Sequence, residues 1–158
     1  MTTINVGHPV PDFEAASTGG QTVKLSGLRG KNLVLYFYPK DQTPGCTRES
    51  CDFRDHLSEF EALNTVILGV SRDTLKSHED FRVKQCLPFD LLSDPDETLC
   101  RLFDVIKMKT MYGKQVLGIE RSTFLIDREG NLAYEWRKVK VDEHIAEVLE
   151  KIGQIQAA

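Results

Sequence analysis

The chain has 158 residues, about the size of one domain, and we expect a single domain over residues 1–158. Basic and acidic residues are mixed along it with a net charge of −4, which argues against a nucleic-acid-binding surface and against a polybasic membrane patch. Its longest strongly apolar run covers only residues 33–38, and the first residues lack the basic and apolar regions of a signal peptide, so we expect a cytoplasmic protein with no membrane partner.

The periodicity of apolar residues predicts an alternation of strands and helices. The first two strands flank the turn residues 17–20 and form a hairpin. The last helix has the clearest signal, with Ile145, Val148 and Ile152 on one face. In chain order the predicted elements are strands at 13–16, 22–25 and 32–38, a helix after the loop 39–45 with an apolar face reaching Leu63, a strand at 65–71, a helix at 73–85, a strand beginning at 91, a helix at 96–103, strands at 122–127 and 131–136, and the terminal helix.

The order of these elements predicts the fold class. Strands that alternate with helices pair in parallel through right-handed crossovers, whereas the late hairpin adds antiparallel strands. The predicted class is therefore α/β, with a mixed central sheet flanked by helices on both faces. We expect a thioredoxin-like fold with an N-terminal β-hairpin extension.

The chain contains four cysteines, Cys46, Cys51, Cys86 and Cys100. No two of them form a Cys-x-x-Cys pair, and no histidine stands at the spacing of a zinc finger, so we expect no metal site. Cys86 and Cys100 are predicted to be small buried apolar residues. Cys46 and Cys51 lie in polar surroundings that do not fit this interpretation.

Cys46 lies where a helix is predicted to begin. Thr43 is a good N-cap residue and Pro44 suits the first helical position, which places Cys46 third in the helix. A sulfur there faces unpaired backbone N–H groups and the positive end of the helix dipole, and both favour the thiolate. The position follows a central strand, at the edge where α/β sheets place their sites. We interpret Cys46 as an activated nucleophile; the alternative is an accidental cysteine at a helix start.

Cys51 follows five residues later in the same predicted helix. Helix geometry separates the two Cα atoms by roughly 8–9 Å, whereas a disulfide requires less than about 7 Å. Cys46 and Cys51 therefore cannot form a disulfide while the helix is intact. If they do pair, the first turns of the helix must unwind.

Residues 38–47, YPKDQTPGCT, carry a Pro-x-x-x-Thr-x-x-Cys pattern that resembles the active-site signature of the peroxiredoxins. With Cys51 and the FRD sequence at 53–55, the longer pattern resembles the Q-type subfamily, also called bacterioferritin comigratory protein. Residues 121–127, RSTFLID, resemble the family's second signature. The resemblance extends from about residue 6 to residue 152, which is nearly the whole chain.

This resemblance implies a role for five residues. Cys46 is expected to be the peroxidatic cysteine, which attacks the peroxide, and Cys51 the resolving cysteine. Thr43 is expected to hold the peroxide, and Arg121 to stabilise the thiolate and polarise the O–O bond. Pro39 is expected to shield the site from water.

The resemblance also implies an activity and its partners. It implies a peroxidase that reduces hydrogen peroxide and organic hydroperoxides through a sulfenic acid and an intramolecular disulfide. Thioredoxin or a glutaredoxin-like dithiol is the implied reductant, and a monomer is the implied state. No cofactor is expected, and the sequence contains neither a G-x-G-x-x-G nor a Walker A motif. Cys86 is the rival resolving cysteine, because some members resolve with a cysteine from the helix that precedes it.

Two other functions stay open at this point. A thioredoxin-like disulfide oxidoreductase would normally carry the Cys-x-x-Cys pair that this chain lacks. A redox-sensing holdase would show little turnover and would expose apolar patches. We interpret the segment around Lys107, Lys109 and Lys114 as a solvated loop rather than a reductant-docking surface, and we expect His56 and His144 at the surface.

Overall fold

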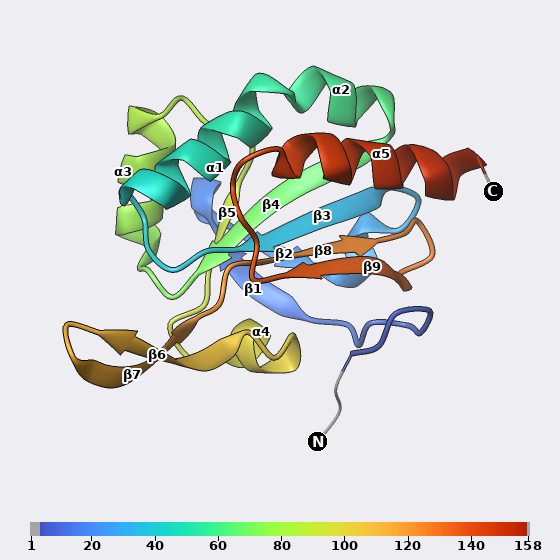
Figure 1. Ribbon diagram of the computed structural model, residues 1–158. Helices are drawn as coiled ribbons and strands as arrows, with labels where there is room; N and C mark the ends of the chain where they lie inside the picture. The colour runs from blue at the N-terminus through green and yellow to red at the C-terminus, as the bar shows by residue number, and fades with distance from the viewer. Residues whose placement is uncertain (1–3, 158) are drawn as a thin grey trace.

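The computed structural model describes residues 4–157. Its strands and helices lie close to the predicted positions (Figure 1). No helix in the described part of the chain is long and apolar enough to cross a membrane. The elements are β1 Glu14–Ser17, η1 Thr18–Gly20, β2 Gln21–Lys24, η2 Leu25–Leu28, β3 Asn32–Phe37, α1 Pro44–Asp55, α2 Leu57–Ala62, β4 Thr65–Ser71, α3 Leu75–Lys84, β5 Leu91–Ser93, α4 Thr98–Leu102, β6 Ile106–Met111, β7 Lys114–Ile119, β8 Ser122–Ile126, β9 Leu132–Arg137 and α5 His144–Ala157.

A mixed seven-stranded sheet forms the centre, in the order β2-β1-β5-β4-β3-β8-β9. β3, β4 and β5 run parallel, as their helical crossovers require, and the other neighbouring pairs are antiparallel. The N-terminal hairpin is part of this sheet, because β1 pairs with β5. The expected α/β fold with a mixed sheet is confirmed.

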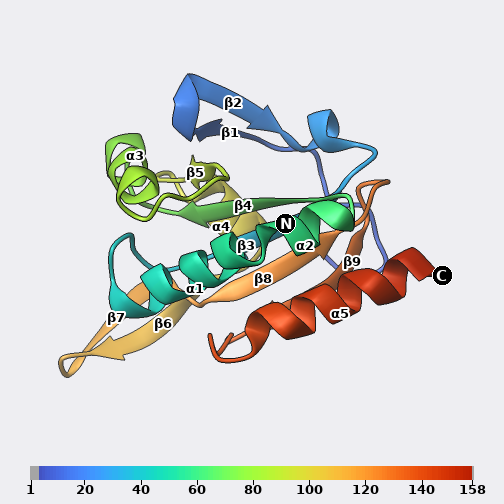
Figure 2. The ribbon, with the colours of Figure 1, turned by 90° about the horizontal axis from the view of Figure 1, so that it is seen from above.

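Both faces of the sheet are covered. On one face α1, α2, α3 and α5 bury aromatic and aliphatic side chains, among them Phe53, Phe81 and Val148, and α1–α2 lie beside α5 (Figure 2). On the other face α4 and the N-terminal segment bury a second cluster that includes Phe103 and Phe124. Alternate residues of the completely buried strand β3 point into the two clusters, so its continuous apolar run reflects burial on both faces.

Two predictions about elements were wrong. The segment around Lys107 and Lys114 is not a solvated loop but the hairpin β6–β7, which projects from the body (Figure 1). Its two-residue turn is Tyr112-Gly113, and both residues have positive φ, 51° and 77°, as a type I′ turn requires. The helix expected to continue to Leu63 is interrupted at His56, where φ is −110° and ψ is 11°.

Candidate active site

Cys46 lies in the first turn of α1, directly beyond the carboxyl end of the central strand β3, and its exposed fraction is only 1%. The predicted register is confirmed: Thr43 is the N-cap and Pro44 the first helical residue. The Thr43 side chain does not cap the helix, however. Its hydroxyl donates to the carbonyl oxygen of Lys40 at 2.8 Å. This hydrogen bond lies within residues 38–43, the segment between β3 and α1 that we call the active-site loop.

Arg121 reaches this cysteine from the junction between β7 and β8. Its Nη2 donates to Cys46 Sγ at 3.4 Å. A guanidinium at this distance favours the negatively charged form of the sulfur. Gly45 allows the approach, because a Cβ at this position would lie only 3.2 Å from Nη2 of Arg121.

Glu49, which the sequence analysis did not identify, holds the other side of the same guanidinium. Its Oε1 accepts from Nη1 of Arg121 at 2.7 Å, and the side chain is buried. Burial raises the pKa of Glu49 to about 7, and the Arg121 charge opposes that rise. Oε2 of Glu49 has no hydrogen-bond partner among residues 4–157. Glu49 stands three residues after Cys46, so helical spacing was the available signal for it.

The other site residues expected from the sequence lie near the start of α1. Pro39 is half-buried and directly follows Tyr38 at the carboxyl end of β3. Cys51 is half-buried two turns into α1, and its Sγ lies 3.5 Å from Oε1 of Gln85. Burial raises the pKa of the Cys51 thiol. All four cysteines are free thiols, and α1 is intact from Pro44 to Asp55.

The remaining cysteines behave differently from one another. Cys100 is buried, as expected, and burial raises its pKa. Cys86 was expected to be buried and is exposed. It has a positive φ of 53° just after the end of α3, where the chain turns away from the helix. The apolar neighbours Leu87 and Phe89, rather than Cys86, return to the core.

His144 was expected at the surface, but it is buried at the start of α5. Its Nε2 lies 2.8 Å from Oγ1 of Thr123, and its ring packs edge-on against Phe53 and Trp136. Burial, followed by the Arg121 charge, lowers the pKa of His144 to about 4, so the ring is neutral at pH 7.

His56 is exposed as expected, beside Glu59.

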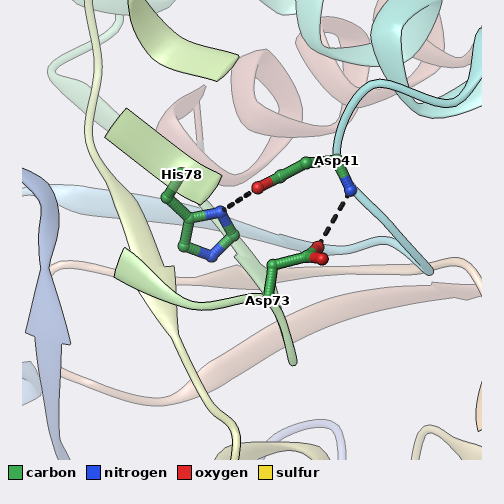
Figure 3. A group of neighbouring side chains, drawn as sticks. All are labelled: Asp41, Asp73 and His78. Atoms are coloured by element: carbon green, nitrogen blue, oxygen red, sulfur yellow. Dashed lines mark hydrogen bonds and ion pairs between the residues drawn. The ribbon is translucent and has the colours of Figure 1, made fainter. Parts of the chain in front are cut away.

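A second polar cluster lies behind the active-site loop. Ligand-type atoms of Asp41, Asp73 and His78 lie within 4.8 Å of one another (Figure 3). Each of these side chains is engaged in hydrogen bonds: His78 Nδ1 with Asp41 at 2.7 Å, and Asp73 with the backbone N–H of Asp41 at 2.9 Å. The arrangement is a hydrogen-bond network, and it does not by itself indicate a metal site.

The AhpC/TSA family model matches residues 6–135, which is most of the chain. Peroxiredoxin Bcp of Bacillus subtilis is 55% identical over 150 residues, covering 95% of this chain and 96% of the relative. The chain belongs to the peroxiredoxins. Its sequence resembles the Bcp or Q-type members, as the motifs predicted, and Peroxiredoxin Bcp of Xanthomonas campestris is 56% identical over 138 residues, 87% of this chain and 86% of the relative.

Solved structures of Bcp and PrxQ proteins are also similar to this peroxiredoxin. A Xanthomonas campestris Bacterioferritin Comigratory Protein structure superposes with a TM-score of 0.89 at 51% identity, covering 95% of this chain and 98% of that one. Xylella fastidiosa PrxQ gives 0.92 at 44% identity, covering 99% of each chain. This peroxiredoxin therefore has the thioredoxin fold and is a thiol-dependent peroxidase, an oxidoreductase that takes a peroxide and a thiol reductant.

Proposed function

We propose that Cys46 is the peroxidatic cysteine of this enzyme and that Arg121 and Thr43 assist it. The observation that carries the proposal is the contact of 3.4 Å between Arg121 Nη2 and Cys46 Sγ at the start of α1. A cation and a helix N-terminus then act on one sulfur, and both favour the thiolate, the reactive form. Pro39, half-buried at the end of β3, limits the access of water in this proposal.

The proposed first step transfers one oxygen atom from peroxide to sulfur. The Cys46 thiolate attacks one oxygen of ROOH, the O–O bond breaks, and RO⁻ leaves and takes up a proton to become ROH. Cys46 becomes a sulfenic acid. Negative charge moves from sulfur toward the leaving oxygen. Arg121 has several N–H donors in a fixed arrangement, which stabilise the charge at both positions. The Thr43 hydroxyl orients the peroxide.

In the proposed second step Cys51 resolves the sulfenic acid. The Cys51 sulfur attacks Cys46 Sγ, water leaves, and a 46–51 disulfide forms. Because both cysteines lie in the intact helix α1, its first turns must unwind before the bond can form. Cys86 is the rival, because it is exposed and directly follows Gln85, whose side chain contacts Cys51.

We infer an external dithiol, thioredoxin or a glutaredoxin-like protein, as the reductant that restores the two thiols. Hydrogen peroxide and organic hydroperoxides are the proposed substrates. The similar Xanthomonas campestris protein is described by its alkyl peroxide reduction activity, which supports the second class. We further propose a cytoplasmic monomer that needs no cofactor.

Cys46→Ser tests the central assignment. We expect the variant to lose peroxidase turnover with a dithiol reductant, because a serine hydroxyl is not ionised at neutral pH. Cys100→Ser is the control, since Cys100 is buried and its raised pKa keeps it protonated. Mass spectrometry of the peroxide-treated wild type is expected to find the 46–51 disulfide. Normal turnover by Cys46→Ser would refute the assignment.

A further inference from the structure

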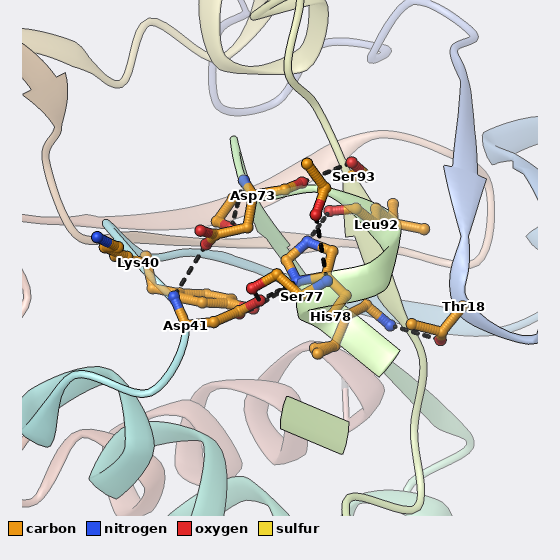
Figure 4. A network of polar contacts seen from close by, with 12 residues as sticks. Thr18, Lys40, Asp41, Asp73, Ser77, His78, Leu92 and Ser93 are labelled. Atoms are coloured by element: carbon orange, nitrogen blue, oxygen red, sulfur yellow. Dashed lines mark hydrogen bonds and ion pairs between the residues drawn. The ribbon is translucent and has the colours of Figure 1, made fainter. Parts of the chain in front are cut away.

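His78 of α3 is completely buried, and both nitrogens of its ring face hydrogen-bond acceptors. Nε2 lies 2.9 Å from the carbonyl oxygen of Leu92 in β5, and a carbonyl can only accept. Nδ1 lies 2.7 Å from Oδ2 of Asp41 in the active-site loop (Figure 4). A neutral imidazole carries one N–H, so a neutral ring can donate to only one of these two acceptors.

The carboxylate of Asp41 shows where the second proton belongs. Its Oδ1 accepts from the Tyr38 hydroxyl at 2.6 Å, and its Oδ2 accepts from the Ser77 hydroxyl at 2.8 Å. Hydrogen bonds to a carboxylate favour its charged form. The proton between Asp41 and His78 therefore belongs to the ring, which makes the pair an imidazolium and a carboxylate.

The other groups around the ring agree with this assignment. Asp73, which precedes α3, adds a second carboxylate to the cluster, with its Oδ2 bound to the Ser71 hydroxyl at 2.5 Å. The hydroxyl of Tyr38, the residue after β3, lies 3.4 Å from Nδ1 of His78, and its proton is directed to Asp41. On its own helix the ring is accompanied by Ser77 and the apolar Phe81. Two carboxylates near one ring favour its positive charge and oppose burial, which acts in the other direction.

We propose that His78 is a positioning residue, whose doubly protonated ring holds Asp41 and thereby fixes the loop that precedes Cys46. Asp41 is also held through its backbone N–H, which donates to Asp73. Gln42 follows with a positive φ of 63°, and the Thr43 hydroxyl then donates to Lys40. The loop between β3 and α1 is thus attached at Asp41 to α3 and, through His78, to β5.

The consequence for catalysis rests on the proposed role of Thr43 in holding the peroxide. If Asp41 loses its partner, the loop that carries Thr43 is free to shift, while Arg121 stays against Cys46 from the other side. We therefore expect weaker peroxide binding with little change in the thiolate itself. In kinetic terms KM for peroxide rises more than kcat falls.

Nitrogen NMR of the histidine rings tests the charge directly. In the reduced protein near neutral pH, we expect a directly bonded proton on both ring nitrogens of His78, because both face acceptors. The signals are assigned by their loss in His78→Asn. In Asp41→Asn we expect the ring to keep only one proton. A His78 ring with one proton in the wild type would overturn the proposal.

A matched pair of substitutions tests the positioning role. His78→Asn keeps an N–H near the position of Nδ1, facing Asp41, whereas His78→Gln keeps one near Nε2, facing the Leu92 carbonyl. Loss of one charge-assisted hydrogen bond corresponds to roughly tenfold. We expect His78→Gln to lower kcat/KM for hydrogen peroxide about tenfold, mostly through KM, and His78→Asn to stay within about threefold of the wild type. His8→Gln, at an exposed histidine, is the control.

The outcomes separate this proposal from the proposed function. Equal losses of kcat/KM in both His78 variants, or no loss in either, would overturn the proposal that His78 positions the loop through Asp41. Far-UV circular dichroism verifies that each variant is folded, and the ring protons are measured in the wild type whether or not the variants fold. Turnover by Cys46→Ser would instead refute the proposed function and leave the His78 proton count untouched.

Discussion

At the scale of single residues, the central feature is one guanidinium between two acceptors. Arg121 donates through Nη2 to Cys46 and through Nη1 to the buried Glu49. The Glu49 contact fixes the plane of the guanidinium, which leaves Nη2 directed at the sulfur. Arg121 therefore acts on Cys46 from a held position, and a flexible amine would not reproduce this geometry.

Removing this guanidinium is expected to slow the peroxide step. One charge-assisted partner contributes about 1.5–3 kcal/mol, so Arg121→Ala is expected to react with peroxide roughly ten- to a hundredfold more slowly. Stopped-flow kinetics measures the rate. Arg48→Ala, at an exposed arginine of α1, is the control. An unchanged rate would remove Arg121 from the site.

Sequence motifs predicted the proposed site residues, but not the residues that hold them. Cys46, Thr43 and Arg121 stand in local patterns that can be read along the chain. Glu49 and His144 are polar residues whose burial depends on segments distant in sequence, Arg121 and Thr123 respectively. Helical spacing places Glu49 on the same side of the helix as Cys46, but a single sequence without the fold does not show that either residue will be buried, so both were missed.

At the scale of elements, α1 carries the proposed chemistry, and the proposed 46–51 disulfide requires it to change shape. Cys51 is half-buried, and its hydrogen bond to Gln85 must break in the proposed unwinding of the helix. Phe53, two residues further on, is completely buried and stacks on Tyr36 at 4.6 Å. The proposed unwinding therefore has a cost, because Cys46, Glu49 and Ser50 in the first half of α1 are buried as well as Phe53 near its end.

Cys51→Ser is expected to consume one equivalent of peroxide and then stall with thioredoxin, because its sulfenic acid has no nearby thiol. Sulfinic acid is expected to accumulate faster than in the wild type. In the wild type, oxidation is expected to reduce the far-UV helical signal and to accelerate amide exchange between residues 43 and 53. Mass spectrometry and hydrogen exchange provide the measurements.

Cys86→Ser is the matched comparison for this experiment. It is expected to turn over like the wild type, since the exposed Cys86 has no part in the proposed disulfide. Normal turnover by Cys51→Ser together with stalling of Cys86→Ser would assign the resolving role to Cys86.

The start of α5 makes a prediction about pH. The pKa of His144 is lowered to about 4 in the folded protein, so the unfolded chain binds the extra proton first as pH falls. The neutral ring of His144 therefore contributes to the free energy of unfolding in full above about pH 6.5. This contribution, roughly 3 kcal/mol, is lost as pH falls toward 4. His144→Gln is expected to lose less stability between pH 7 and about pH 4.5, as measured by urea unfolding. An identical pH dependence in the two proteins would show that His144 does not titrate this way.

Most elements were predictable because their patterns are local. The buried strands, the N-cap of α1 and the apolar face of α5 all follow from neighbouring residues. The hairpin β6–β7 escaped prediction although residues 106–109, IKMK, alternate apolar and polar residues, because the several lysines of this segment favoured a solvated loop. In the structure the sides are the reverse of the usual ones. Lys109 is half-buried, and burial followed by the Arg121 charge lowers its pKa, while Met108 and Tyr112 are exposed.

At the scale of the whole molecule, the sheet and its helical cover meet closely at Gly69 in β4. A Cβ at this position would lie 2.8 Å from both Leu91 Cδ2 and Tyr36 Cζ. Tyr36 cannot move aside easily, because its hydroxyl lies 2.9 Å from that of Ser50 in α1. Gly69 therefore permits the packing of β3 and β5 side chains beneath α1.

Gly69→Ala is expected to destabilise the protein by about 1–3 kcal/mol, the usual effect of overpacking a core. For a chain of this length that corresponds to a fall in Tm of roughly 2–12 °C. Differential scanning calorimetry measures the change. Gly27→Ala is the control, because a Cβ there meets no atom within 4 Å. Equal Tm values for the two variants would contradict the close packing at Gly69.

The edges of the sheet have a consequence for self-association. An enzyme that loosens a covering helix in every catalytic cycle risks adding strands from neighbouring molecules to its open sheet. Here β1 pairs with β5, and the outermost strand, β2, is only four residues long with exposed Gln21 and Lys24. The opposite edge strand, β9, carries the Glu135–Arg137 ion pair. A short strand at one edge and charged side chains at both disfavour pairing with strands of other molecules, which would protect the sheet during the proposed unwinding of α1.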